Sequence, residues 1–133
     1  MSQIRQPAVA GAFYLGQRQT LSRDLRAMLD AVPPGLASAL PVPKAIIVPH
    51  AGYAYSGAVA AAAYRTLDNE AAASIRHVVL LGPSHRVKMR GLALPSYDHF
   101  STPFGQVRVN YQGRRRLREL GLAGIADALI SHP

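Results

Sequence analysis

The stretch KAIIVPHAGYAYSG, residues 44–57, decides the fold that we expect, because an apolar run within it ends on a histidine, His50. Ala45–Val48 is too short and too rich in β-branched residues for a helix, so it predicts a buried strand. The alanine-rich residues 58–67, which follow the turn, favour a helix. The sequence therefore predicts a strand that turns at His50 toward a helix.

The same arrangement returns at HVVLLGPSHR, residues 77–86, where a second apolar run ends on His85. Val78–Leu81 is apolar without interruption, which is typical of a parallel strand that is covered on both faces. Together the two runs and the segment between them predict a strand-helix-strand unit. We therefore expect an α/β fold built on such βαβ units, with a mainly parallel sheet flanked by helices.

The rest of the chain shows no further repeat and no linker, so we expect one domain over residues 1–133. Apolar residues at helical spacing favour a helix over residues 20–32, with Thr20 as its N-cap. The sequence further predicts a proline-rich loop at 33–43, a strand at 91–95, an exposed turn at 96–105 and an extended edge segment at 106–110.

Composition limits the class of protein. Hydrophobic residues make up 49% and charged residues 17% of the 133 positions, which is typical of a folded globular chain. The absence of cysteine excludes disulfides and cysteine-rich zinc sites. The first residues lack the apolar core of a secretory signal, and no segment has the ~18 apolar residues that span a bilayer. We therefore expect a cytoplasmic protein that does not bind membranes.

The net charge of +8 raises the question of a nucleic-acid partner. The tight basic cluster is Arg114, Arg115, Arg116 and Arg118, and it fits the solvated face of a short helix. Aromatic residues are few and are not interleaved with the basic ones, so no stacking platform is indicated. We do not expect nucleic acid as a partner.

The two strand-end histidines predict a metal site. The carboxyl ends of parallel strands meet on one rim of the sheet, and ligands bind at that rim in open α/β folds. Because neighbouring strands lie about 4.8 Å apart, His50 and His85 could converge on one divalent ion. A single histidine at a strand end is more often a hydrogen-bonded boundary residue, and the matched pair makes metal binding as good an explanation as that one.

Three other polar residues are candidates for the same site. Asp98 and His99 lie in the expected turn and could reach the rim, although a solvated turn explains them better. Ser84 lacks the G-x-S-x-G context of a nucleophile elbow, so no catalytic role follows for it.

The segments RQPAVAGAFYLG, VPHAGYAYSGAVAAAAY, LLGPSHR and STPFGQVRV resemble the Memo family, the protein B component of the AmmeMemoRadiSam set, over Ile4 to Asn110. That family is similar to the class III extradiol dioxygenases, whose α/β fold holds non-haem iron at the strand ends. The resemblance implies that His50 and His85 are metal ligands, with iron, or else copper or zinc, as the cofactor. Family members are longer, and their remaining site residues lie in the second half. The chain is therefore expected to be a truncated, incomplete fold that exposes apolar surface and forms homo-oligomers.

Two functions follow as hypotheses. The first is a Memo-like metal-binding protein, a non-haem dioxygenase or redox protein. In it Tyr53 and Tyr55 would orient an oxygen-bearing substrate or donate a proton. The alternative for the two tyrosines is a role in packing alone. The second is a non-catalytic module that binds an anionic or phosphorylated peptide or a protein partner on the glycine-rich turn. The sequence does not identify the small molecule or peptide that would bind.

Overall fold

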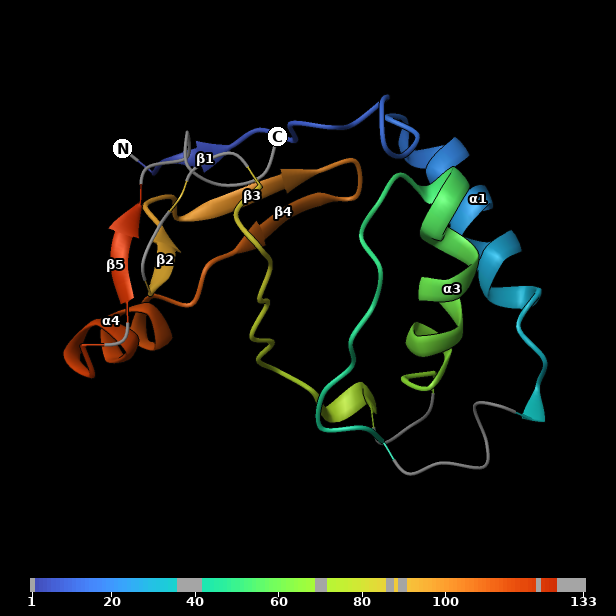
Figure 1. Cartoon of the computed structure of the whole chain (residues 1–133). Helices are drawn as coiled ribbons and strands as arrows, with labels where there is room; N and C mark the ends of the chain where they lie inside the picture. Colours follow the sequence, from blue (N-terminus) through green and yellow to red (C-terminus); the bar gives the residue numbers. More distant parts are fainter. Residues whose placement is uncertain are drawn as a thin grey trace. The chain divides into compact units, whose positions relative to one another are not determined.

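The computed structural model describes residues 2–35, 42–68, 72–85, 88 and 91–121, and the backbone of 123–126 (Figure 1). The chain forms two compact units, which are described separately below. One unit is Val9–Val78, and the other combines Met1–Ala8 with Val79–Pro133.

The unit Val9–Val78 is built on a pair of helices that pack against each other, α1 (Arg18–Asp30) and α3 (Tyr53–Arg65) (Figure 1). A short 3₁₀ turn, η1 (Ala72–Ser74), lies near its end. The buried apolar side chains Leu21, Val32 and Ala61 form its core. Within the described residues, no helix combines the length and the apolar character that crossing a membrane requires.

The helix pair packs closely at Gly57, which is buried in α3. A Cβ atom built on Gly57 would clash with the Met28 sulfur of α1. The missing side chain therefore lets the two helices approach, and this explains why a residue with poor helix propensity lies inside α3.

Both helices begin earlier than the sequence predicted. The N-cap of α1 is Gln17, and the Thr20 hydroxyl donates to the Gln17 carbonyl at 3.0 Å, so the prediction of Thr20 as the N-cap is wrong. The N-cap of α3 is Gly52, and the helix begins at Tyr53, five residues before the predicted start at residue 58. The glycine- and tyrosine-rich segment after His50 is thus mostly the first turns of a helix.

The second unit contains two small sheets and a helix. The first sheet has the order β1-β3-β4, with β1 (Ile4–Arg5) parallel to β3 (His99–Thr102) and β3 antiparallel to β4 (Gly105–Arg108). In the second sheet, β2 (Leu92–Pro95) pairs in parallel with β5 (Ala123–Ala126). Helix α4 (Tyr111–Glu119) follows β4, and the Asn110 side chain caps it by accepting a 2.9 Å hydrogen bond from the Gly113 N–H.

These elements confirm part of the prediction for this region. The strand expected at 91–95 is β2, and the expected edge segment overlaps β4, which lies at the edge of its sheet. The prediction of an exposed turn at 96–105 is wrong for His99–Thr102, because β3 is the central strand of the three-stranded sheet; residues 103–104 do form a turn, which joins β3 to β4. Two partners, β1 and β4, supply the hydrogen bonds that make this segment a strand.

The two apolar runs that decided the predicted fold do not form strands. Neither Ala45–Val48 nor Val78–Leu81 pairs with another segment of the described chain, and both lie in extended, irregular backbone. Ile47 is 98% exposed. β-Branched residues favour an extended backbone, but a strand forms only where another strand satisfies its N–H and C=O groups. The α/β class is confirmed, whereas a mainly parallel sheet built on these two runs is not formed.

Gly57→Ala should destabilise the unit Val9–Val78. The Met28 side chain would have to leave its place beside Gly57, and overpacking of this kind costs typically about 2 kcal/mol, more than the gain of about 1 kcal/mol in helix propensity. Chemical denaturation should therefore show a lower midpoint, and Met28→Ala in the same chain should remove most of the difference between glycine and alanine at position 57.

The matched control is Gly113→Ala in α4, where the added Cβ atom would meet Asn110 atoms no closer than 3.6 Å. This change should stabilise its helix or leave it unchanged. An equal effect of the two substitutions would contradict the close contact between α1 and α3.

Candidate functional site

His50 is an exposed residue on the loop that leads into α3. Two hydrogen bonds fix the end of this loop that adjoins α3. The Tyr53 N–H donates to the Phe13 carbonyl at 2.7 Å, and the buried Ser56 hydroxyl donates to the Ala51 carbonyl at 2.8 Å. The backbone next to the exposed His50 is thus held in place.

The two candidate tyrosines differ in their surroundings. Tyr53 is half-buried, and its ring centroid lies 5.6 Å from that of Tyr14 in a tilted arrangement. Burial, and to a lesser degree the neighbouring Tyr14, Tyr64 and Asp24, raises the pKa of the Tyr53 hydroxyl above its usual value. Tyr55 is 89% exposed. Tyr53 therefore keeps its proton at neutral pH, and Tyr55 is open to contact with a ligand.

His85 is also exposed, and it lies in the other unit, directly after Pro83 and Ser84. Because His50 and His85 belong to separate units, their convergence on one ion stays a prediction. Within the part of the chain that the structure describes, no three histidine, aspartate or glutamate side chains lie together in a way that could hold a metal ion.

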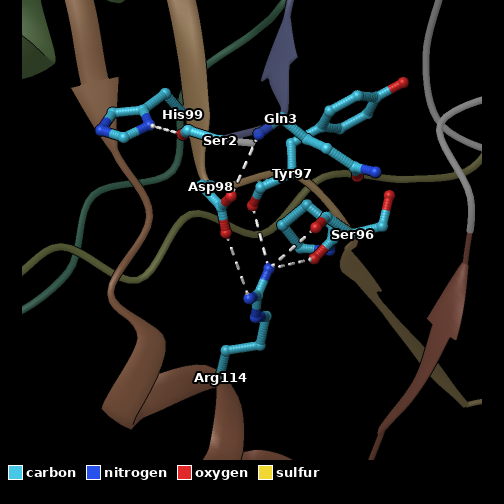
Figure 2. Close-up of polar contacts among 8 residues, drawn as sticks. Ser2, Gln3, Ser96, Tyr97, Asp98, His99 and Arg114 are labelled. Carbon is cyan, nitrogen blue, oxygen red and sulfur yellow. Dashed lines mark hydrogen bonds and ion pairs between the residues drawn. The ribbon is translucent and has the colours of Figure 1, made fainter.

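A polar cluster that the sequence did not predict surrounds Arg114 of α4 (Figure 2). The Arg114 side chain is only 11% exposed, and its guanidinium donates to the carbonyls of three consecutive residues, Pro95 (3.1 Å), Ser96 (3.2 Å) and Tyr97 (2.9 Å). It also pairs with the Asp98 carboxylate at 3.6 Å. We call this set the Arg114 cluster; it fastens α4 to the segment between β2 and β3.

The Arg114 cluster extends to the N-terminal segment. The second Asp98 oxygen accepts from the Gln3 N–H at 3.1 Å, and Ser2 Oγ lies 3.1 Å from His99 Nδ1 (Figure 2). Asp98 and His99, weighed above as additional site residues, therefore bind parts of their own unit. Arg5 of β1 lies over the Phe100 ring at 5.7 Å, which adds a cation–π contact between β1 and β3.

Sequence reasoning placed Arg114 on a solvated helix face with the other arginines, and that prediction is wrong for this residue. Arg115 and Arg116 are exposed and pair with Glu119, whereas Arg114 points inward. The spacing of the residues could have indicated the inward position of Arg114. Arg114 and the half-buried Leu117 are three residues apart and therefore share one helix face.

Comparison with known proteins was decisive for the family. Residues 5–125 match the family described as Memo-like protein. The chain belongs to the Memo family. This confirms the resemblance that the histidine-bearing segments indicated.

Relatives in this family include proteins of Aquifex aeolicus, Caenorhabditis elegans and Homo sapiens. The chain is 34% identical over 114 residues to a MEMO1 family protein of Aquifex aeolicus, covering 86% of this chain and 39% of that protein. It is 34% identical over 114 residues to the Protein memo-1 homolog of Caenorhabditis elegans, covering 86% and 31%. It is 34% identical over 118 residues to Protein MEMO1 of Homo sapiens, covering 89% and 37%. The matched part of this Memo-family chain thus spans between about a third and two fifths of each relative's length.

The raised pKa of Tyr53 predicts a loss of stability at alkaline pH. Since the folded state holds this proton more tightly than the unfolded state, its stabilising contribution is present below the usual pKa of 10.0 and is lost as the pH rises through the higher folded-state value. The free energy of unfolding should fall less steeply above pH 10 in Tyr53→Phe than in the parent. Tyr55→Phe is the control and should keep the parent's slope; equal slopes in all three proteins would contradict the burial of Tyr53.

Arg114→Ala should destabilise the second unit by about 2 kcal/mol or more, because it removes charge-assisted hydrogen bonds to a largely buried group. Amide hydrogens of residues 96–99 should exchange faster, which measures the loosening directly. Arg116→Ala removes an exposed charge that lies 3.7 Å from Glu119 and should change stability by no more than about 0.5 kcal/mol. Similar effects of the two changes would show that the Arg114 cluster does not hold this segment.

Proposed function

We propose that this Memo-family chain is a metal-binding protein to which His50 and His85 contribute imidazole ligands. The observation that supports the proposal is the shared local setting of the two histidines. Each is exposed and follows an extended apolar run and a proline, at Pro49 and Pro83 respectively. Proline restricts the backbone near each ligand and so lowers the entropy that is lost on binding.

The donor chemistry fits a transition metal. Imidazole nitrogen is a common ligand of iron, copper and zinc, and we propose iron as the ion with copper and zinc as alternatives. Catalytic metal sites use about three protein ligands, so His50 and His85 make up part of a site and at least one more ligand is required. A complete site with non-haem iron would supply oxygenation chemistry of the dioxygenase type.

Other residues of this chain would then act on the ligand that binds beside the metal. The neutral Tyr53 hydroxyl can donate a hydrogen bond or a proton to an oxygen atom of a bound molecule. The exposed Tyr55 ring offers apolar contact and a hydroxyl on the same helix. The bond between the Tyr53 N–H and the Phe13 carbonyl positions the first turn of α3, and with it both rings.

A second function, binding of an anionic or phosphorylated peptide or protein without turnover, is favoured by the start of α3. Its N-cap is Gly52, no side chain caps the helix, and its first turn contains no acidic residue. The positive end of the helix dipole and the net charge of +8 would attract an anion there.

Metal content, measured by mass spectrometry after anaerobic purification, tests the first function. The parent should retain iron, copper or zinc, and His50→Ala/His85→Ala should lose affinity by more than the ~10-fold that removal of an outer-shell partner costs. His77→Ala is the matched control, since His77 is also exposed and follows no apolar run, and should retain the metal. A parent without metal, or a double variant that binds as well as the parent, would exclude this role for the two histidines.

Phosphopeptide binding at two salt concentrations tests the second function. An anion site at the start of α3 should survive His50→Ala/His85→Ala and weaken as salt rises, because screening reduces its electrostatic attraction. Binding that is insensitive to salt would contradict an electrostatic site.

A further inference from the structure

The positive charge of the chain is concentrated in one of its two units. Residues 1–8 and 79–133 carry nine of the fifteen lysine and arginine residues but three of the seven carboxylates, which is a net charge of +6. The six basic and four acidic residues of the other unit give +2. Four of the nine basic residues are in α4, which contains one acidic residue. Such a helix attracts polyanions.

Helix α4 directs one arginine inward and three outward. Arg114 is 11% exposed and fastens the helix to the segment between β2 and β3 through the Arg114 cluster (Figure 2). The side chains of Arg115 and Arg116 are 68% and 72% exposed, and Arg118 is exposed as well. Because the inward arginine fixes the helix, the outward arginines are presented on an ordered element, which lowers the entropy that is lost on binding.

The acidic residue of α4 neutralises only part of this charge. The Arg115 Nε–H donates to the Glu119 carboxylate at 2.9 Å, and an Arg116 nitrogen lies 3.7 Å from the same carboxylate. Among the residues that the structure describes, none forms an ion pair with Arg118. The outer side of α4 therefore keeps an excess of positive charge.

An aromatic ring lies on the same outer side. Residues four and seven positions apart on a helix share a face, so Tyr111, Arg115 and Arg118 lie in one row. Tyr111 is 58% exposed, and the Arg114 guanidinium lies over its ring, 5.7 Å from the centroid. The buried arginine thus contacts the ring and leaves more than half of the side chain open to a ligand.

The order of the residues along the chain does not reveal this row. In the sequence Tyr111 precedes the arginines and does not alternate with them, so no stacking platform was expected. Two turns of helix, about 10 Å at 1.5 Å per residue, bring the ring and the two guanidinium groups onto one side. Proteins that bind single strands combine a basic track with an aromatic ring on which a base stacks.

We propose that the row Tyr111, Arg115 and Arg118 on α4 binds single-stranded nucleic acid, with a base on the tyrosine ring and phosphates on the two arginines. The tyrosine distinguishes this partner from other polyanions. A double strand keeps its bases stacked on one another, and an acidic peptide of aspartate and glutamate has no π-face to offer. Both would use the arginines alone. The proposal goes beyond metal binding and requires no metal.

The salt dependence of binding tests the phosphate contacts. Fluorescence anisotropy of a labelled oligothymidylate of about 15 nucleotides is followed with the full chain at several salt concentrations. Two phosphate contacts predict that the logarithm of the association constant falls against the logarithm of salt with a slope of about −1.4, and Arg118→Ala should reduce this slope to about −0.7. Arg23→Ala removes an exposed arginine of α1 and should keep the parent's slope.

Tyr111→Leu tests the stacking. Loss of one stacked base should weaken binding of the oligothymidylate about 5-fold or more and leave binding of a duplex of the same length unchanged. Tyr111→Phe keeps the ring and should bind as the parent does. Tyr64→Leu is the matched control, because Tyr64 is a 47% exposed tyrosine of α3 with Asp68, and no arginine, four residues later.

Glu119→Gln gives a test with the opposite sign. It removes the carboxylate that pairs with Arg115 and Arg116, so binding of the oligothymidylate should become about 2-fold tighter. Amide hydrogens of residues 96–99 should exchange at the parent's rate in Tyr111→Phe and Arg118→Ala, which shows that the Arg114 cluster is intact in these variants.

Three outcomes would overturn the proposal. The first is a parent that does not bind the oligothymidylate. The second is equal affinity of the parent, Tyr111→Leu and Tyr111→Phe, which would show that the ring contacts no base. The third is tighter binding of polyglutamate or of phosphatidylserine vesicles than of the single strand, which would assign the arginines to an acidic protein or to a membrane surface.

Discussion

The backbone of an extended segment must satisfy its N–H and C=O groups, and this requirement decides which parts of the chain form regular structure. β3 meets it twice, through β1 in parallel and β4 in antiparallel register, and becomes the centre of a sheet despite the turn-forming residues before it. Val78–Leu81 has far stronger strand-forming residues and remains irregular. In this chain the availability of a partner outweighs intrinsic propensity.

The same contrast explains how much the sequence could predict. The helical spacing of residues 20–32 and the arginine-rich segment before Leu120 both correspond to helices, α1 and α4, because helices satisfy their backbone internally. Strand pairing depends on segments that are distant in the sequence, so β1 and β5 could not be predicted from their own residues. The class of fold was therefore accessible from the sequence, whereas the partners of each strand were not.

Of the candidate site, the two histidines stand out in the sequence because they repeat in one local pattern, and the segments that carry them resemble the family to which the chain belongs. Their role as metal ligands stays a prediction. The early start of α3 was not accessible. It depends on the Phe13 carbonyl, forty residues away in the sequence, which accepts a hydrogen bond from the Tyr53 N–H. The role of Arg114 could not be predicted from charge either. It is one of fifteen lysine and arginine residues, but its guanidinium binds three backbone carbonyls and a carboxylate of its own unit.

Tyr53 and Tyr55 lie in a helix, and this gives one of them a role in packing and the other a role at the surface. Residues two apart on a helix point in directions about 200° apart, so one ring lies against Tyr14 while the other is exposed. Substitution at position 53 alters packing, and substitution at position 55 alters what the surface presents to a ligand. Position 55 can therefore diversify among related sequences at little cost in stability, and differences in ligand preference can accumulate there while the interior of the unit stays the same.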